Sequence, residues 1–521
     1  MNTKMLKYLF LLLLPASAMA QKAVNDKEFQ QALTTNRFYA DSASQEMLRF
    51  AKLSSYYLNA MMPERFSKIS LAYSFNKGTY IPSQQATKIN GGKLSTEGTV
   101  KLGHIKLFGG FSYSKTFEDS TRFSHQTRNN TSSPYYFGSP AYVHYERSVY
   151  SFQAMANKNF LREKLNLSIG TDYKVGDHFS TNDPRGSIAE YQFNLNAALG
   201  YTLSPFVKLG LGYRHGYGQE KVTIGYKNPR YYESSSFPMY YNHLVNGYGE
   251  TKPILNERRY NDDQQRNGLD LYLDLNAGSL GNFNLFANYI EENQRYFFAN
   301  AFGFTDYSKY NLKTSDIKLL WNKMLANGSI GAQTQYQSVH GADYNIDFGA
   351  NNYKYLSSSA SAKLFLTTQT AKSIFNHFIK AAYLEEERID GIRGNDVYFS
   401  HAMLMAGSGK RWIKEKSRYV SLGFTAHYQF PLSDDFTVAP ANEAYFTRYV
   451  IYHDYLFNTS SAAGGEITVE YGFPILKMML SSIKLNALYK QKLDQKSLNR
   501  TIVTSPGKDR FSSNISLNLY F

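Results

Sequence analysis

Apolar and polar residues alternate with a period of two along most of this chain, from Phe66 to its C-terminal end. The clearest run sets one apolar face against one polar face: Tyr191, Phe193, Leu195, Ala197, Leu199, Tyr201 and Leu203 against Gln192, Asn194, Asn196 and Thr202. This period is that of a β-strand whose two faces meet different surroundings. Because it recurs in many segments, it excludes a helical protein and predicts an all-β fold.

The connections between the strands alternate between short and long. Short ones include 203–205, 278–282, 326–328 and 414–417, and long ones span 118–141, 218–265, 291–309, 339–352 and 433–460. Outer-membrane barrels have short periplasmic turns and long external loops. A soluble β-sandwich has no reason to sort its loops in this way, so the sequence predicts a transmembrane antiparallel β-barrel.

The alternating segments predict 18 strands, an even number that suits a bacterial single-chain barrel. The predicted ranges are 66–76, 89–102, 104–117, 142–158, 164–175, 188–203, 206–217, 266–278, 283–291, 310–325, 329–339, 353–367, 373–385, 396–413, 417–430, 462–475, 481–492 and 510–521. The stretch 433–461 contains Tyr445, Tyr449, Tyr452 and Tyr455. It admits another strand pair or an extension of its neighbours, so the expected count is about 16 to 20.

The last predicted strand resembles the terminal strand of outer-membrane barrels. Leu517, Leu519 and Phe521 fall on one face, and polar residues such as Asn518 fall on the other. We expect these three apolar residues to form the assembly signal that the barrel-insertion machinery recognises. The same face is expected to meet lipid.

The N-terminus has the features of an export signal. Lys4 and Lys7 precede an apolar run from Leu9 to Leu14, and small residues follow up to Ala20. This pattern predicts a signal peptide at 1–20, cleaved after Ala20, and an outer-membrane location for the barrel at 66–521. Residues 21–65 lack strand alternation and are expected to be helical. They form either a plug or a flexible lead-in to the first strand.

Composition limits the possible partners. The chain has no Cys, which excludes disulfides and thiolate metal sites, and its net charge of +15 is spread along the sequence. The sequence contains no block of Lys and Arg residues of the kind that predicts nucleic-acid binding. Membrane lipid and anionic lipopolysaccharide at the outer rim are the expected contacts. The high Tyr content, 44 residues against 2 Trp, suits interfacial girdles and ligand-contacting loops.

No sequence motif predicts catalysis. The 11 His residues are scattered, and the chain has no HExxH motif, nucleophile elbow or phosphate loop. Gly210-Leu211-Gly212 lies within a strand, where paired Gly relieves crowding. Some His residues, such as His401 and His427, lie on predicted strands. A single sequence does not show whether any of them lies next to a Ser in the fold. We therefore expect no enzyme activity, no catalytic residue, no metal site and no cofactor.

Charged residues of both signs are expected to face the lumen. The candidates are Lys106, Asp172, Lys174, Lys208, Arg214, Asp270 and Asp274. Charges of both signs can line a path for a polar solute, or they can form ion pairs that fill the barrel.

Tyr and Arg are concentrated in the long loops, where they provide flat apolar faces together with hydrogen-bonding groups. The candidate contact residues for a ligand or partner are Tyr226, Arg230, Tyr231, Tyr232, Tyr240, Tyr241, Arg258 and Arg259, with Tyr135 and Tyr136 from the 118–141 loop. The alternative is that these side chains pack the loops against each other over the barrel mouth.

Several short motifs carry a family resemblance. The mature lead-in, Tyr73-Ser74-Phe75, Phe108-Gly109-Gly110-Phe111-Ser112-Tyr113 and Pro134-Tyr135-Tyr136 resemble a family of Bacteroidota outer-membrane β-barrel proteins of unknown function. Members of that family tend to be encoded near TonB-dependent uptake systems. The resemblance implies an outer-membrane location and a barrel fold. The expected function is transport, by a porin-like channel or by an accessory barrel of such an uptake complex. The alternative is a structural or adhesive barrel with a filled lumen whose external loops bind a partner.

Overall fold

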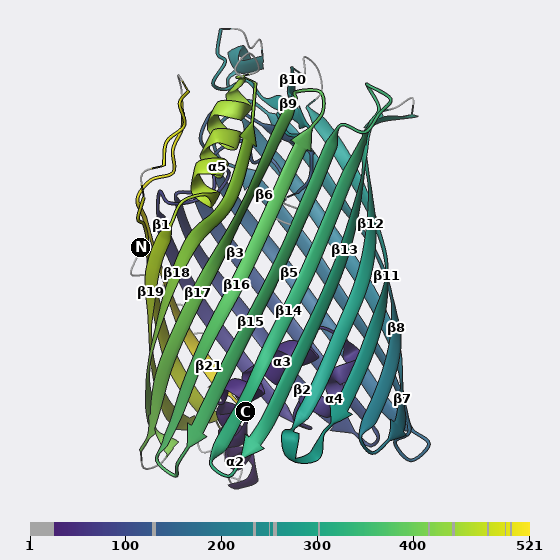
Figure 1. The fold of residues 1–521 in the computed structure, drawn as a ribbon, viewed down its shortest axis with the longest axis vertical. Helices are drawn as coiled ribbons and strands as arrows, with labels where there is room; N and C mark the ends of the chain where they lie inside the picture. Colours follow the sequence, from purple (N-terminus) through teal and green to yellow (C-terminus); the bar gives the residue numbers. More distant parts are fainter. Residues whose placement is uncertain are drawn as a thin grey trace.

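Eighteen antiparallel strands form one closed sheet in the computed structural model (Figure 1). They are β1 Phe66–Gly78, β2 Lys88–Leu102, β3 Ile105–Thr121, β5 Val143–Phe160, β6 Leu165–Ser180, β7 Arg185–Ser204, β8 Val207–Gly225, β11 Arg259–Asn276, β12 Asn282–Asn300, β13 Gly303–Leu325, β14 Gly328–Asn345, β15 Tyr353–Gln369, β16 Ser373–Asp390, β17 Asn395–Ile413, β18 Tyr419–Thr437, β19 Ala462–Leu476, β20 Met479–Lys492 and β21 Asp509–Tyr520. Neighbours in sequence pair with each other, and β1 pairs with β21 to close the barrel. The predicted fold class and strand count are confirmed.

The structure describes residues 26–127, 132–232, 236–249, 251–253, 258–300, 303–414, 417–439, 443–476, 479–494, 496–500 and 503–521. The predicted signal peptide at 1–20 lies outside these residues. Among them, no helix is long and apolar enough to span a membrane.

The strands are longer than predicted at the end of the barrel that carries the long connections. β12 continues to Asn300 and β13 begins at Gly303, so the prediction of a long loop at 291–309 is wrong. Along these extensions the outward side chains turn polar, as at Asn293, Arg295 and Lys309. Apolar alternation fades where a strand leaves the lipid, which is why the sequence pattern ended too early.

The uncertain stretch at 433–461 forms a helix rather than another strand pair. β18 extends to Thr437, and the π-helix η7 (Thr447–Ile451) leads into α5 (Tyr452–Asn458). Tyr445, Tyr449 and Tyr452 stand at positions i, i+4 and i+7, which is helical spacing.

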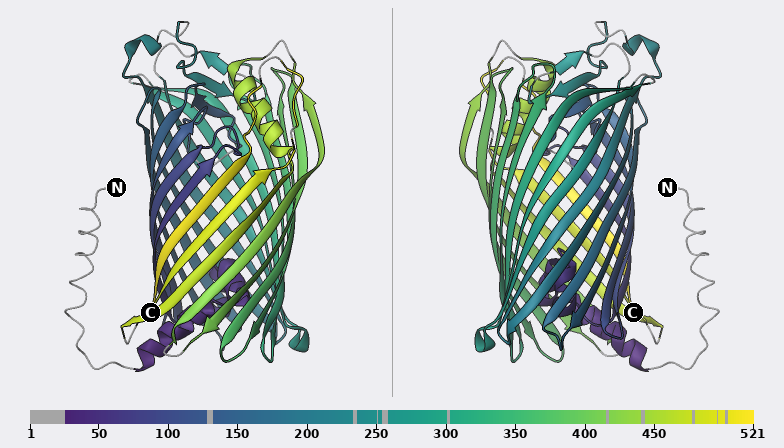
Figure 2. Two further views of the ribbon diagram at one scale, coloured as in Figure 1. Left: turned by 90° about the vertical axis from the view of Figure 1, so that its left-hand side faces the viewer. Right: turned by 90° about the vertical axis from the view of Figure 1, so that its right-hand side faces the viewer.

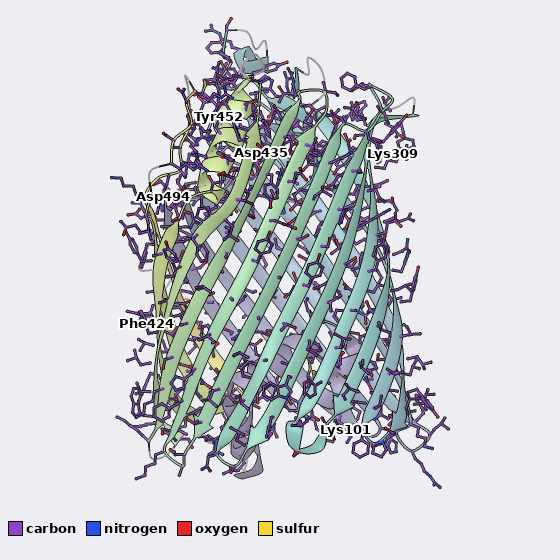
Figure 3. The ribbon with its side chains drawn as sticks, in the orientation of Figure 1. Lys101, Lys309, Phe424, Asp435, Tyr452 and Asp494 are labelled. Carbon is purple, nitrogen blue, oxygen red and sulfur yellow. The ribbon has the colours of Figure 1, made fainter. Side chains whose placement is uncertain are left out.

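The barrel wall presents apolar side chains outward and polar or closely packed ones inward. On β11, Leu269 and Leu271 are exposed, while the alternate residues Asp270 and Tyr272 are buried. Phe424 on β18 likewise projects from the outer wall (Figure 3). Trp321 and Trp412 lie near the short turns, and exposed Tyr residues such as Tyr217 lie toward the opposite end. This is the arrangement of a barrel with an aromatic girdle at each membrane surface.

Chain segments occupy both ends of the lumen (Figure 2). Four short helices lie at the end with the short turns: α2 Asp26–Phe38, α3 Ser42–Ala51, η2 Ser55–Tyr57 and α4 Leu58–Met61. At the other end a three-stranded sheet of β4 Tyr135–Gly138, β9 His243–Asn246 and β10 Thr251–Pro253 packs near α5. The remaining elements are η3 Pro229–Tyr232 and η4 Gly278–Leu280.

Candidate functional site

Residues 26–62, called the plug from here on, pack against the inner wall of the barrel. Buried apolar side chains of α3, η2 and α4 meet inward-facing residues of distant strands, and together they form one cluster: Phe50, Tyr56, Tyr57, Leu58 and Met61 with Phe108, Tyr272, Phe286, Leu320 and Phe365. The rings of Tyr56 and Tyr272 stack with their centroids 4.2 Å apart. Apolar burial therefore fixes the plug to one part of the wall.

A buried ion pair anchors the plug backbone. Arg214 Nε donates to both carboxylate oxygens of Asp270, at 2.6 and 2.8 Å, and Arg214 Nη2 donates to the carbonyl of Leu53 at 2.8 Å. Tyr272 Oη donates to the same carboxylate at 2.6 Å and lies 2.6 Å from Ser54 Oγ. Wall and plug thus share one hydrogen-bond network, and every charge in it has a partner.

Three more of the predicted lumen-facing charges contact the plug. Lys106 Nζ donates to the carbonyl of Met62, and Lys208 Nζ lies 4.4 Å from the centre of the Tyr56 ring. Asp274 accepts a hydrogen bond from Tyr56 Oη at 2.9 Å. These side chains therefore contact a chain segment that lies inside the barrel.

The last two predicted lumen charges, Asp172 and Lys174, line a polar chamber beside the plug. This chamber has a volume of about 550 Å³ and is lined from β2, β3, β5, β6 and β7, with Lys52 contributed by the plug. Its polar lining consists of Lys93, Ser95, Glu97, Ser112, Ser151, Gln153, Gln192 and Asn194. A second hollow, of about 280 Å³, is lined by inward residues of β14–β17, including Gln335, Lys380 and His401. Space for polar solutes therefore remains in the lumen.

Three inward-folded segments form a cap at the opposite end: residues 122–142, 241–249 and 443–461, of which 128–131 are outside the described residues. Their aromatic and aliphatic side chains form one buried cluster with inward residues of the wall. Tyr135, 1% exposed, lies between Tyr260 and Tyr296, with ring centroids 5.4 and 4.9 Å away. Burial lowers the pKa of His243 to about 4, so its ring is neutral at pH 7.

The expected contact residues of the loops, apart from Arg259, fall into two groups. Tyr135, Tyr136, Tyr241 and Arg258 are buried, and the Arg258 guanidinium lies 5.5 Å from the ring centres of Tyr226 and Tyr241. These residues pack the cap, as in the alternative in which the loops pack against each other. Arg259 is exposed on the outer wall, 4.6 Å from the Phe298 ring.

The second group forms an exposed tip, made by residues 226–232 and 236–240. Tyr231 and Tyr240 stack with their centroids 4.2 Å apart, and Tyr226 Oη donates to the carbonyl of Tyr240 at 3.1 Å. Arg230 is exposed beside them, and Tyr232 lies in the same helical turn, η3. The tip is therefore an ordered aromatic surface that projects from the barrel (Figure 1).

The expected assembly residues lie at the seam where the barrel closes. Leu517 and Leu519 pair with Leu71 and Ile69 of β1, and the Phe521 amide donates to the carbonyl of Ser67 at 3.0 Å. Helix α2 lies against β1, β20 and β21. Thr35 Oγ1 of this helix donates to the carbonyl of Phe521 at 3.0 Å.

Sequence reasoning missed the residues that attach α2, and Tyr39 directly after it, to the wall. Asn36 donates to Tyr419 Oη at 2.9 Å and accepts from Arg411 at 2.9 Å, and Arg411 also pairs with Glu470 at 3.1 Å. Tyr39 donates to Glu97 at 2.7 Å. The partners are far apart in sequence, so no spacing pattern marks them. The sequence signal for these contacts is that charged and amide residues occupy inward positions among small residues. Such side chains indicate that a polar partner lies inside the barrel.

Within the described residues, no group of three or more His, Asp or Glu side chains is placed to hold a metal ion. The lumen carboxylates of Glu97, Asp270, Asp274 and Glu470 have Arg, Lys or Tyr partners.

The chain has remote likenesses to solved structures. No curated protein matches it. The siderophore receptor PiuA from Acinetobacter baumannii is 9% identical, with 87% of this chain and 82% of that chain covered and a TM-score of 0.36. The FrpB iron transporter from Neisseria meningitidis is 8% identical, with 89% and 82% covered and a TM-score of 0.42. Likenesses this remote carry no argument about function. A family model matches residues 56–521, and the chain belongs to that family, the family of unknown function DUF6850.

Proposed function

We propose that this protein is an outer-membrane barrel that serves the uptake of a polar solute, and that the plug is its gate. The polar chamber of about 550 Å³ supports this proposal, because wall and plug line it together. A barrel that only needed a filled interior would gain stability from apolar packing at that level. A displaced plug would join the chamber to the periplasmic end of the lumen.

A reversible crosslink tests the gate. Ser55 Oγ of the plug donates to Asn196 Oδ1 of the wall at 2.9 Å, and the chain has no Cys of its own. We expect the double variant Ser55→Cys/Asn196→Cys to stay closed in planar bilayers when oxidised and to show channel openings after reduction. The two single-Cys variants are the matched controls. Equal conductance of the oxidised and reduced double variant would show that the plug is not the gate.

The exposed tip supports a second role, the binding of a neighbouring barrel. Stacked Tyr rings beside an exposed Arg make a rigid, amphipathic surface of the kind that dominates protein interfaces. This role suits an accessory subunit of a TonB-dependent uptake complex.

Trimming the tip separates the two roles. Replacing residues 229–240 by a short Gly/Ser link should leave the barrel assembled, because the cap residues from Tyr241 onward stay in place. We expect crosslinking to uptake receptors in the membrane to fall, while channel openings persist. Shortening the loop at 346–351 provides the control. Undiminished crosslinking of the trimmed protein would exclude the tip as a docking surface.

A further inference from the structure

The outer wall of the barrel is electrically asymmetric near the end that carries the long loops. On β7–β13, outward side chains in this region comprise six cations and three anions: Arg185, Lys221, Arg259, Arg295, Lys309 and Lys313, with Asp263, Glu291 and Asp306. On β16–β18 the outward charges at the same end are Glu385, Glu387, Asp396 and Asp435. Lys309 and Asp435 both lie toward this end in Figure 3.

The basic side is also hollowed. A depression of about 780 Å³ lies on the outer face, across β7, β8 and β11–β14. Its outward lining includes aromatic, amide and cationic groups and one carboxylate: Tyr217, Tyr344, Gln265, Asn293, Arg295, Lys309 and Asp263. Amides donate and accept hydrogen bonds as sugar hydroxyls require, and Tyr rings offer an apolar face with a polar edge. The depression lies beyond the apolar part of the wall, at the level expected for lipid headgroups.

Two cations stand side by side in this depression. Arg295 and Lys309 are direct cross-strand partners of β12 and β13. Arg295 is paired with Asp306 at 2.6 Å, and Lys309 is exposed. Asp306 engages Nε and Nη2 of Arg295. The remaining guanidinium N–H groups and the Lys309 ammonium are donors that a phosphate between the two strands would meet, because Arg and Lys both bind phosphate oxygens by charge-assisted hydrogen bonds.

We infer that this depression binds the phosphorylated sugar headgroup of an outer-leaflet glycolipid, with Arg295 and Lys309 on a phosphate. The inference rests on the proposed outer-membrane location. The amide and Tyr groups contact the sugar rings, and the acyl chains lie along the apolar wall below. The acidic side over β16–β18 repels the same headgroup, so glycolipid is bound on one side of the barrel.

Lipid titrations of the purified full-length mature protein in neutral detergent test this site. The probes are lipopolysaccharide with phosphorylated lipid A, the same preparation after enzymatic dephosphorylation, and phosphatidylglycerol. We expect Arg295→Gln/Lys309→Gln to weaken binding of intact lipopolysaccharide by about tenfold, the loss of roughly one charge-assisted hydrogen bond. Dephosphorylated lipopolysaccharide should bind more weakly and equally to both proteins. Glu385→Gln/Glu387→Gln is the matched control and should bind at least as tightly as the wild type.

Three results would overturn the site. These are equal affinity of the double variant and the wild type, equal affinity for dephosphorylated lipopolysaccharide, and competition by phosphatidylglycerol at the same concentration. The last would show recognition of charge alone. The single variant Lys309→Gln, at an exposed position, replaces the double variant if the latter fails to show heat-modifiable migration. Membrane fractionation tests the location separately, so a wrong location and a wrong site give different results.

Discussion

The double variant Leu519→Asp/Phe521→Asp is expected to disappear from the outer membrane. Both side chains belong to the outward face of the terminal strand, and Phe521 is 38% exposed. A carboxylate near the membrane surface costs only about 1 kcal/mol or less, since even Lys and Arg reach 2–4 kcal/mol only at the midplane. This direct cost is too small to unfold the barrel. We therefore attribute the expected loss to failed recognition by the insertion machinery.

Charges on the other face of the same strand are the matched control. Ser512→Asp/Ser516→Asp adds the same two carboxylates on the lumen side of β21, next to inward residues of β1 and β20. We expect normal outer-membrane levels and heat-modifiable migration for this control. Normal levels of the Leu519/Phe521 variant would show that the terminal apolar face is not read during assembly.

Arg214→Gln is expected to release the plug and to destabilise the barrel around it. The substitution leaves the Asp270 carboxylate, whose side chain is 0% exposed, without its cation, and removes the donor to the Leu53 carbonyl. Removing one partner of a buried ion pair costs about 3–5 kcal/mol. Heat-modifiability should show a lower unfolding temperature, and planar bilayers should show more frequent channel openings.

A compensating variant separates charge from packing. Arg214→Gln/Asp270→Asn leaves no buried charge and should recover most of the lost stability. Lys164→Gln, at an exposed turn residue, should behave as the wild type. An unfolding temperature of Arg214→Gln equal to that of the wild type would show that the pair does not anchor the plug.

The barrel is predictable from the sequence because lipid imposes a simple rule on every spanning strand. Outward residues such as Leu269 and Leu271 must be apolar, and the inward residues between them need not be. The rule ends where the strand leaves the membrane, which is why β12 and β13 were predicted too short. The helix at 447–458 was missed because its Tyr spacing was considered only as strand alternation.

The contents of the lumen were much less predictable. The sequence indicated helix in the plug region and charges on inward faces, but not that Arg214 meets Leu53 or that Lys106 meets Met62. These contacts join residues far apart in the chain. Strand periodicity shows which side chains point inward but not which residue each of them contacts. Likewise, Tyr135 and Tyr240 are the same type of residue in two of the predicted long loops. Only the fold of the loops buries Tyr135 and exposes Tyr240.

The contact between α2 and the barrel seam has a consequence for the order of biogenesis. Thr35 bonds to the carbonyl of Phe521, and Tyr39 packs on Tyr520 with ring centroids 5.8 Å apart. The surface that α2 contacts is formed jointly by β1 and β21, the first and last strands of the barrel. The N-terminal helix, although synthesised first, completes these contacts only after the final strand has zipped onto the first. Docking of α2 therefore requires a closed barrel. A barrel that has not yet closed lacks part of the surface that holds the helix.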